Sequence, residues 1–335
     1  METIRYPSLA SPFTPGMNPH ALAVEDGTYR WVERYGLLDR ARSARLSRLL
    51  YGHLMARAYP LAPLPALQLI ADWNTWLFLL DDQCDEAGLG RNPTQLAEVH
   101  AALLAIMRGV RPAASAPPEY QTLADLAQRL RSYAGDGWMQ RFILQVSAYF
   151  TANVWEATNR AESRIPDVAT YLTQRPYTGA VFCYIALIEL AGLLHIRPAM
   201  HAHPDVQRLA HMTNNIICWS NDIISLDKEL RHGDVHNLVV ILHHERKLSL
   251  QEAVLQVAAL HDTEVEMFAS LANRLCASLA PEDADVARYI AGMQFWMRAN
   301  LDWSAATSRY QPEYIESSPG QASLPASDTM LSVGI

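Results

Sequence analysis

The sequence lacks the features that mark secreted, membrane-spanning and nucleic-acid-binding proteins. Its four cysteines are widely scattered without a CxxC pair, and three lie in apolar helical runs, so we expect core thiols in a reducing compartment. The net charge of −8 argues against a nucleic-acid partner, because phosphate binding needs a basic face. Residues 1–27 contain four prolines and no apolar run typical of a signal peptide. We therefore expect a cytoplasmic protein.

Segments that would cross a membrane or form a sheet are also scarce. The most hydrophobic run, 180–194, is short for a membrane span and is interrupted by Glu189. Period-two alternation is nearly absent, whereas helical spacing of apolar residues recurs along the chain. Neither an internal repeat nor a long linker divides the 335 residues. We predict an all-α, single-domain helical bundle over 18–310, after an irregular segment at 1–17 and before a flexible tail at 311–335.

Capping residues and helix breakers predict the bounds of the helices. Asn18-Pro19 begins a helix that Gly36 ends, and Ser249 opens another with a capping box. Proline and glycine predict a break at Arg175-Pro176 and Gly179. Further helices are expected at 42–59, 64–86, 93–109, 119–134, 137–162, 203–232 and 282–310.

A first cluster of candidate metal ligands follows an apolar, aromatic-bearing run at 76–80. It comprises Asp81, Asp82, Asp85 and Glu86, and in a helix Asp81 and Asp85 share one face. Glycines follow at once, so these acids lie at the negative end of a helix dipole, where a cation is stabilised. Such a cluster suits a hard divalent cation, although taken alone it is equally compatible with a solvated helix end.

A second cluster combines Asn221, Ser225 and Glu229, which are spaced i, i+4, i+8 and so form one stripe on a helix. An amide oxygen, a hydroxyl and a carboxylate on one stripe can share a magnesium ion, and the adjacent Lys228 can reach an anion held by that metal. An ordinary polar helix face is the alternative. The largely apolar flank at 211–224 argues against it, because it predicts a helix with little exposed surface.

These two motifs resemble those of bacterial class I terpene cyclases. The segment Asp81-Asp82-Gln83-Cys84-Asp85 is similar to the family's aspartate-rich motif. The pattern Asn221-Asp222-x-x-Ser225-x-x-Lys228-Glu229 is similar to its Asn/Ser/Glu metal motif. The resemblance covers about 20–310 and implies a helical bundle with the active site between the two metal-bearing helices.

The resemblance also extends to single residues outside the metal motifs. Arg175, 46 residues before Asn221, is similar to the family's diphosphate sensor, and Arg309-Tyr310 to the Arg-Tyr pair near its C-terminus. Thr178 and Gly179 then take the positions of the linker and the effector. The linker is often Asp in the family, so Thr178 departs from the pattern.

By resemblance, the substrate is an acyclic isoprenyl diphosphate that three Mg2+ ions clamp and ionise, with Mn2+ as a substitute. The implied metal ligands are Asp81, Asp82, Asp85, Asn221, Ser225 and Glu229. The implied donors to the diphosphate are Arg175, Lys228, Arg309 and Tyr310. A main-chain carbonyl at Gly179 would approach the departing carbon. Phe78 and Trp303 are candidates to stabilise the carbocation, and plain core packing is the alternative for each aromatic.

We expect farnesyl diphosphate as the substrate, because it is the commonest case in the family. Large residues near the motifs also limit the cavity volume: Phe78, Phe182, Trp219 and Trp303. A diterpene cyclase acting on geranylgeranyl diphosphate, a chain-elongating prenyl transferase and a non-enzymatic helical metal-binding scaffold are the alternatives. A prenyl transferase would need a second Asp-rich motif at 221–229. The product and the oligomeric state, a homodimer included, stay open.

Overall fold

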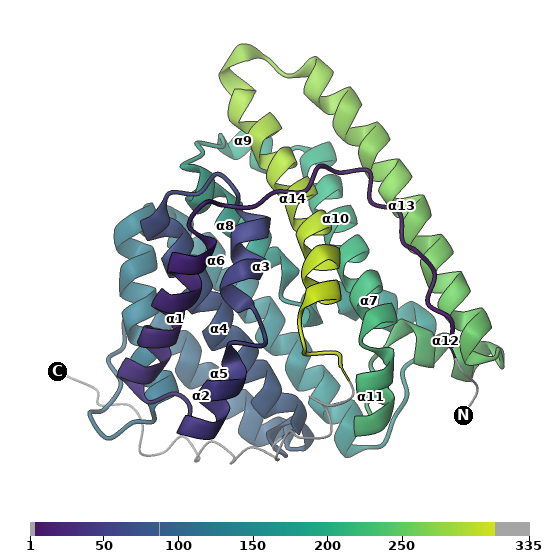
Figure 1. Cartoon of the computed structure of the whole chain (residues 1–335), viewed down its shortest axis with the longest axis horizontal. Helices are drawn as coiled ribbons and strands as arrows, with labels where there is room; N and C mark the ends of the chain where they lie inside the picture. Colours follow the sequence, from purple (N-terminus) through teal and green to yellow (C-terminus); the bar gives the residue numbers. More distant parts are fainter. Residues whose placement is uncertain (1–3, 87, 312–335) are drawn as a thin grey trace. The chain divides into compact units, whose positions relative to one another are not determined.

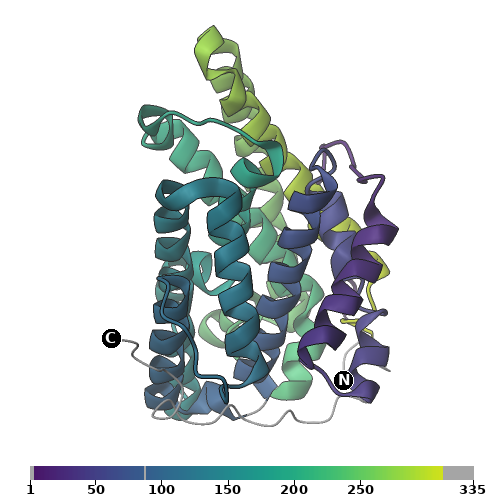
Figure 2. The same cartoon turned by 90° about the vertical axis from the view of Figure 1, so that its left-hand side faces the viewer.

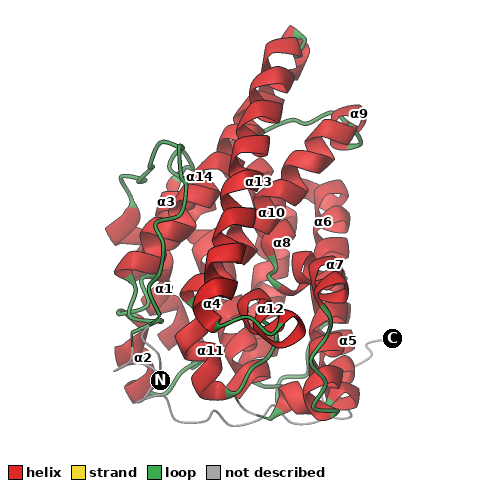
Figure 3. Cartoon of the chain, turned by 90° about the vertical axis from the view of Figure 1, so that its right-hand side faces the viewer, coloured by secondary structure: helices red, strands yellow, loops and turns green. Residues whose placement is uncertain are grey.

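The computed structural model describes residues 4–86 and 88–311, apart from the side chains of residues 40, 41, 44 and 83–86. Within these residues the secondary structure is helical and contains no strand, which confirms the all-α prediction (Figure 3). In the same residues no helix combines the length and the apolar character that a membrane crossing requires. The predicted tail lies outside the described residues except for Gln311.

The described residues form two compact units. The N-terminal unit comprises 19–56 and 62–164, and the C-terminal unit comprises 4–18, 57–61 and 165–311. The aspartate-rich motif belongs to the N-terminal unit. The Asn/Ser/Glu motif, Arg175 and Arg309-Tyr310 all belong to the C-terminal unit.

In the N-terminal unit, α4 packs against α1 and α6, and α5 packs against α6 (Figure 2). The predicted bounds of α4 are confirmed, and Gly135, with φ 80° and ψ 168°, kinks α6 between the two helices predicted there. The helices are α1 (Ala21–Tyr35), α2 (Arg40–Leu46), α3 (Tyr51–Ala58), α4 (Leu64–Glu86), the 3-10 turn η1 (Leu89–Arg91), α5 (Pro93–Met107) and α6 (Pro118–Ala161).

The prediction of one helix over 42–59 is wrong. Two helices stand there, because Leu50 takes the left-handed region with φ 57° and so ends the helical path between α2 and α3. Leu46 and Leu49 are both buried, so the apolar period continues across the break. The hydrophobic pattern alone therefore could not reveal it.

In the C-terminal unit, α10 packs against α7, α8, α13 and α14. Cys183 and Cys218 are buried as expected, whereas Cys276 is exposed on α13. The helices are α7 (Val168–Thr178), α8 (Val181–Gly192), α9 (Pro198–His201), α10 (Pro204–Ile224), α11 (Leu226–His232), α12 (Leu238–Arg246), α13 (Leu250–Ser278), the 3-10 turn η2 (Pro281–Asp283) and α14 (Ala284–Ala306).

Two predicted helices of the C-terminal unit differ from their expected bounds. The expected helix over 203–232 is divided at Ser225 into α10 and α11. The Oγ of Ser225 lies 2.7 Å from the carbonyl oxygen of Asn221, one turn earlier, and hydrogen bonds of this kind often bend helices. The expected helix over 282–310 ends at Ala306, because Thr307 is extended, with φ −70° and ψ 150°.

Residues 4–18 form a strap without helix, whose first part, 5–13, lies along α13 (Figure 1). Arg5 exchanges two hydrogen bonds with the Gln251 side chain, of 2.7 and 3.0 Å, and the amide of Ala10 donates to Asp262 at 2.8 Å. Phe13 packs edge-on against Phe268. Residues 5–13 span roughly 26 Å when extended, and α13 rises about 25 Å over 251–268. The two segments therefore have matching lengths between their first and last contacts.

Candidate active site

The predicted stripe of oxygen donors is present at the junction of α10 and α11. The amide of Ser225 donates to the carbonyl of Asn221 at 2.8 Å, and the amide of Glu229 donates to the carbonyl of Ser225 at 2.9 Å. Helical hydrogen bonding therefore continues through the junction and keeps the i, i+4, i+8 spacing. The Ser225 hydroxyl lies 2.7 Å from Oε1 of Glu229, so two of the three predicted ligands are in direct contact.

The surroundings of Glu229 fit a divalent cation. Burial, and then the carboxylates of Asp222 and Asp234, raise the pKa of Glu229 to about 8. A cation would offset this repulsion and favour the ionised carboxylate. The donor set, an amide, a hydroxyl and a carboxylate, offers the oxygen ligands that magnesium prefers.

Arg175 lies at the end of α7 and is largely buried. Its Nε and Nη2 donate to the same oxygen of Asp222, at 3.0 and 2.6 Å, and Nη2 also lies 3.0 Å from Oδ1 of Asn221. Nη1 donates to the hydroxyl of Thr178 at 3.2 Å. The sensor and linker candidates are thus in contact with each other and with the metal motif, even though Thr178 replaces the acid that is common in the family.

Three further residues of this site, Asp222, Tyr171 and Asn237, were not among the predicted site residues. Asp222 is fully buried and also accepts from the Tyr171 hydroxyl and from the amide of Leu238, each at 3.0 Å. Asn237 donates from Nδ2 to Oε2 of Glu229 at 2.6 Å. Its position directly before the apolar run 238–242 is a helix-start signal that could have drawn attention to it.

Of the two interruptions predicted here, the one at Arg175-Pro176 is wrong and the one at Gly179 is confirmed. Helix α7 continues through Pro176 to Thr178, and the left-handed residue is Ala180, with φ 54°. Gly179 itself has φ −83°, so it is not required for a special dihedral. It is required for space, because a Cβ built there would lie 2.6 Å from Sγ of Cys218. The approach of the Gly179 carbonyl to the departing carbon stays a prediction.

The Arg-Tyr pair follows α14. The Tyr310 hydroxyl accepts a hydrogen bond from Nδ2 of Asn221 at 3.0 Å, and its ring packs edge-on against Trp303 at 5.9 Å. Arg309 is buried, and its amide donates to the Thr307 hydroxyl. Tyr310 thus lies at the metal motif. Lys228 is half-buried on α11, one residue before Glu229.

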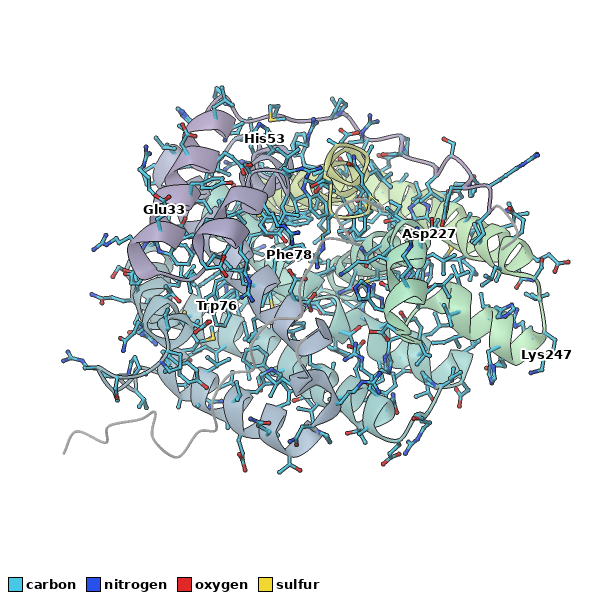
Figure 4. All side chains as sticks on the ribbon, turned by 60° about the horizontal axis from the view of Figure 1, so that its bottom comes forward. Glu33, His53, Trp76, Phe78, Asp227 and Lys247 are labelled. Atoms are coloured by element: carbon cyan, nitrogen blue, oxygen red, sulfur yellow. The ribbon has the colours of Figure 1, made fainter. Side chains whose placement is uncertain are left out.

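The aspartate-rich motif lies in the last turns of α4, in the N-terminal unit. Asp81 accepts a hydrogen bond from the Tyr149 hydroxyl at 3.1 Å, and Asp82 is largely buried. The side chain of Asp85 lies outside the described side chains. Phe78, two residues from Trp76 on the same helix (Figure 4), packs against Tyr51 with ring centroids 4.6 Å apart.

These observations define an all-α protein with an oxygen-donor metal motif in contact with a buried arginine and a tyrosine. The family described as terpene synthase family 2, C-terminal metal binding, matches residues 72–267. The chain belongs to the terpene synthase family, and the match includes the family's metal-binding region.

Characterised relatives cover nearly the whole chain. The (+)-T-muurolol synthase ((2E,6E)-farnesyl diphosphate cyclizing) of Roseiflexus castenholzii is 42% identical over 308 residues, which cover 91% of this chain and 94% of the relative. The germacrene A synthase of Nostoc punctiforme is 34% identical, with 92% and 96% covered. The crystal structure of germacradien-4-ol synthase from Streptomyces citricolor matches with a TM-score of 0.79 at 29% identity, covering 90% and 99% of the two chains.

The close packing at Gly179 gives a first prediction. Gly179→Ala is expected to lower the free energy of unfolding by about 1–3 kcal/mol, because the added methyl group meets Cys218. Chemical denaturation measures the loss, and a Cys218→Ala background should reduce it. Gly137→Ala is the control, because a Cβ there has nothing within 4 Å. An equal loss with and without Cys218 would contradict the packing explanation.

Proposed function

We propose that the protein is a Mg2+-dependent sesquiterpene synthase, which ionises farnesyl diphosphate, cyclises the resulting cation and releases diphosphate. The observation that carries the proposal lies at the junction of α10 and α11, where Asn221 contacts both Arg175 and Tyr310. The other two residues of the stripe, Ser225 and Glu229, contact each other there. Oxygen donors for a cation and nitrogen and hydroxyl donors for an anion are thereby brought together. A metal-bound diphosphate needs both kinds of donor.

The metal ligands are assigned from the donor chemistry together with the family resemblance. Asn221, Ser225 and Glu229 hold one magnesium ion. Asp81, Asp82 and Asp85 hold the remaining ions of a three-ion set. Bound magnesium supplies the positive charge that makes diphosphate a good leaving group. Mn2+ prefers similar oxygen ligands and is expected to substitute.

The remaining residues orient the diphosphate and protect the cation. Arg175, Lys228, Arg309 and Tyr310 donate hydrogen bonds to diphosphate oxygens, and Arg175 provides the planar fork that suits them. Thr178 links Arg175 to Gly179, whose small size lets its carbonyl approach the departing carbon. The faces of Phe78 and Trp303 stabilise the carbocation and help to exclude water.

The choice of a fifteen-carbon substrate is supported by the relatives. The Roseiflexus protein, 42% identical, is named as cyclising (2E,6E)-farnesyl diphosphate. The direct test is to incubate purified protein and Mg2+ with geranyl, farnesyl and geranylgeranyl diphosphate and to identify the products by gas chromatography–mass spectrometry. We expect a cyclic sesquiterpene hydrocarbon or alcohol from farnesyl diphosphate, together with free diphosphate.

Two other results would change the assignment. Cyclic products from geranylgeranyl diphosphate alone would identify a diterpene cyclase and overturn the substrate length. Longer linear diphosphates, formed when isopentenyl diphosphate is added, would identify a prenyl transferase and overturn the reaction type.

The metal assignment of Glu229 gives a second prediction. Glu229→Gln keeps the shape of the side chain but removes its charge, so turnover is expected to fall by at least about 10²-fold. Steady-state kinetics over a range of magnesium concentrations measures the change. Glu266→Gln, at an exposed position on α13, is the matched control. Normal turnover in folded Glu229→Gln protein would remove Glu229 from the metal ligands.

Arg175 gives a third prediction. A lysine in its place cannot reproduce the two bonds from Nε and Nη2, so Arg175→Lys is expected to lower kcat/KM about tenfold or more. Binding of inorganic diphosphate in the presence of Mg2+, measured by calorimetry, should weaken as well. Arg197→Lys is the control, because Arg197 also donates from Nε and Nη2 to one aspartate, Asp283, although to both of its oxygens. Unchanged diphosphate binding by Arg175→Lys would assign Arg175 a purely structural role.

A further inference from the structure

Asn237 connects the three helices around the metal motif. It is fully buried and is the N-cap of α12, where its Oδ1 accepts from the amides of Val239 and Val240 at 2.8 and 3.4 Å. Its Nδ2 donates to the carbonyl of Asp222 on α10 and to Oε2 of Glu229 on α11, each at 2.6 Å. One side chain thus caps one helix and contacts the other two.

The capping bonds fix which end of the amide faces Glu229. Backbone amides can only donate, so the oxygen of Asn237 must point at Val239 and Val240. The NH2 group must then point at Glu229 and at the Asp222 carbonyl. Both hydrogens of the NH2 group then have an acceptor. The hydrogen-bond partners therefore determine which end of the amide carries the oxygen and which the nitrogen.

Each carboxylate oxygen of Glu229 contacts a different side chain. Asn237 donates to Oε2 at 2.6 Å, and the Ser225 hydroxyl, whose one hydrogen also faces the Asn221 carbonyl, lies 2.7 Å from Oε1. A free glutamate side chain has several rotamers, and ordering it lowers its entropy. A carboxylate that is held in this way is already ordered, yet an ionised carboxylate has further lone pairs with which to ligate a cation.

We infer that Asn237 is a positioning residue for the metal ligand Glu229, in addition to capping α12. The inference rests on the proposed function, since it needs Glu229 to ligate a metal. Partners that orient metal ligands typically contribute about 10- to 100-fold to metal affinity. Removing the Nδ2 donor while keeping the cap should therefore weaken metal binding by that factor.

The test separates positioning from capping. Asn237→Ser keeps an oxygen that can cap α12, but it replaces the two amide hydrogens with one hydroxyl hydrogen on a shorter side chain, which cannot serve both the Asp222 carbonyl and Glu229. Mn2+ binding is followed by the electron paramagnetic resonance signal of the free ion, with the metal alone and with added inorganic diphosphate. We expect the Kd for Mn2+ to rise about 10- to 100-fold in Asn237→Ser.

A matched variant controls for the loss of a helix cap. Ser249 caps α13 by accepting from the amide of Glu252, far from the metal motif in the chain. Ser249→Ala should lower the unfolding midpoint in urea and leave the Kd for Mn2+ unchanged. If Asn237→Ser does not fold, Asn237→Thr serves in its place, because threonine also caps and fills more of the space.

The outcomes distinguish this inference from the proposed function. A wild-type Kd in the Asn237 variant, with weakened binding in Glu229→Gln, would overturn the positioning role and leave the metal assignment intact. A wild-type Kd in Glu229→Gln would overturn the metal assignment itself. Weaker binding in both, with no change in Ser249→Ala, would confirm that Asn237 acts through Glu229.

Discussion

The carboxylate of Asp222 holds the metal-motif end of the C-terminal unit together. It is fully buried, and a buried carboxylate is costly unless its oxygens are paired. Arg175 and Tyr171 from α7 and the amide of Leu238 from α12 supply the pairing. Removing one partner of a buried ion pair costs about 3–5 kcal/mol, because the other charge is left unpaired. The relative placement of α7, α10 and α12 therefore depends on this one group.

Helices whose ends are marked by local chemistry were predictable from the sequence. The capping box at Ser249 begins α13, and apolar length with flanking glycines gave α4 its bounds. The breaks at Leu50 and Ser225 were not predictable in the same way. Leu50 is left-handed although leucine has no preference for that region. At Ser225 the backbone hydrogen bonds of the helix continue, and a single serine within a helical pattern does not predict a division.

The candidate site was predictable where its residues share one helix. Asn221, Ser225 and Glu229 stand out because a fixed spacing places three oxygen donors on one stripe. Tyr171 and Asn237 contact the metal motif from other helices. A contact between different helices cannot be predicted from the spacing of residues in one sequence. The close packing of Gly179 against Cys218 was not predictable either, because it depends on how α7 packs against α10.

The strap along α13 has a consequence for how its sequence can vary. At Arg5 and Ala10 the strap offers backbone groups, whereas α13 offers the side chains of Gln251 and Asp262. At these two positions the contact therefore depends on the side chains of α13 and not on the side chains of the strap. Substitutions at positions 5 and 10 should be tolerated wherever the chain stays extended, whereas Tyr6, Phe13 and Asn18 are constrained by contacts of their own side chains. Gln251 and Asp262, which lie 246 and 252 residues after their partners in the strap, should tolerate substitution far less.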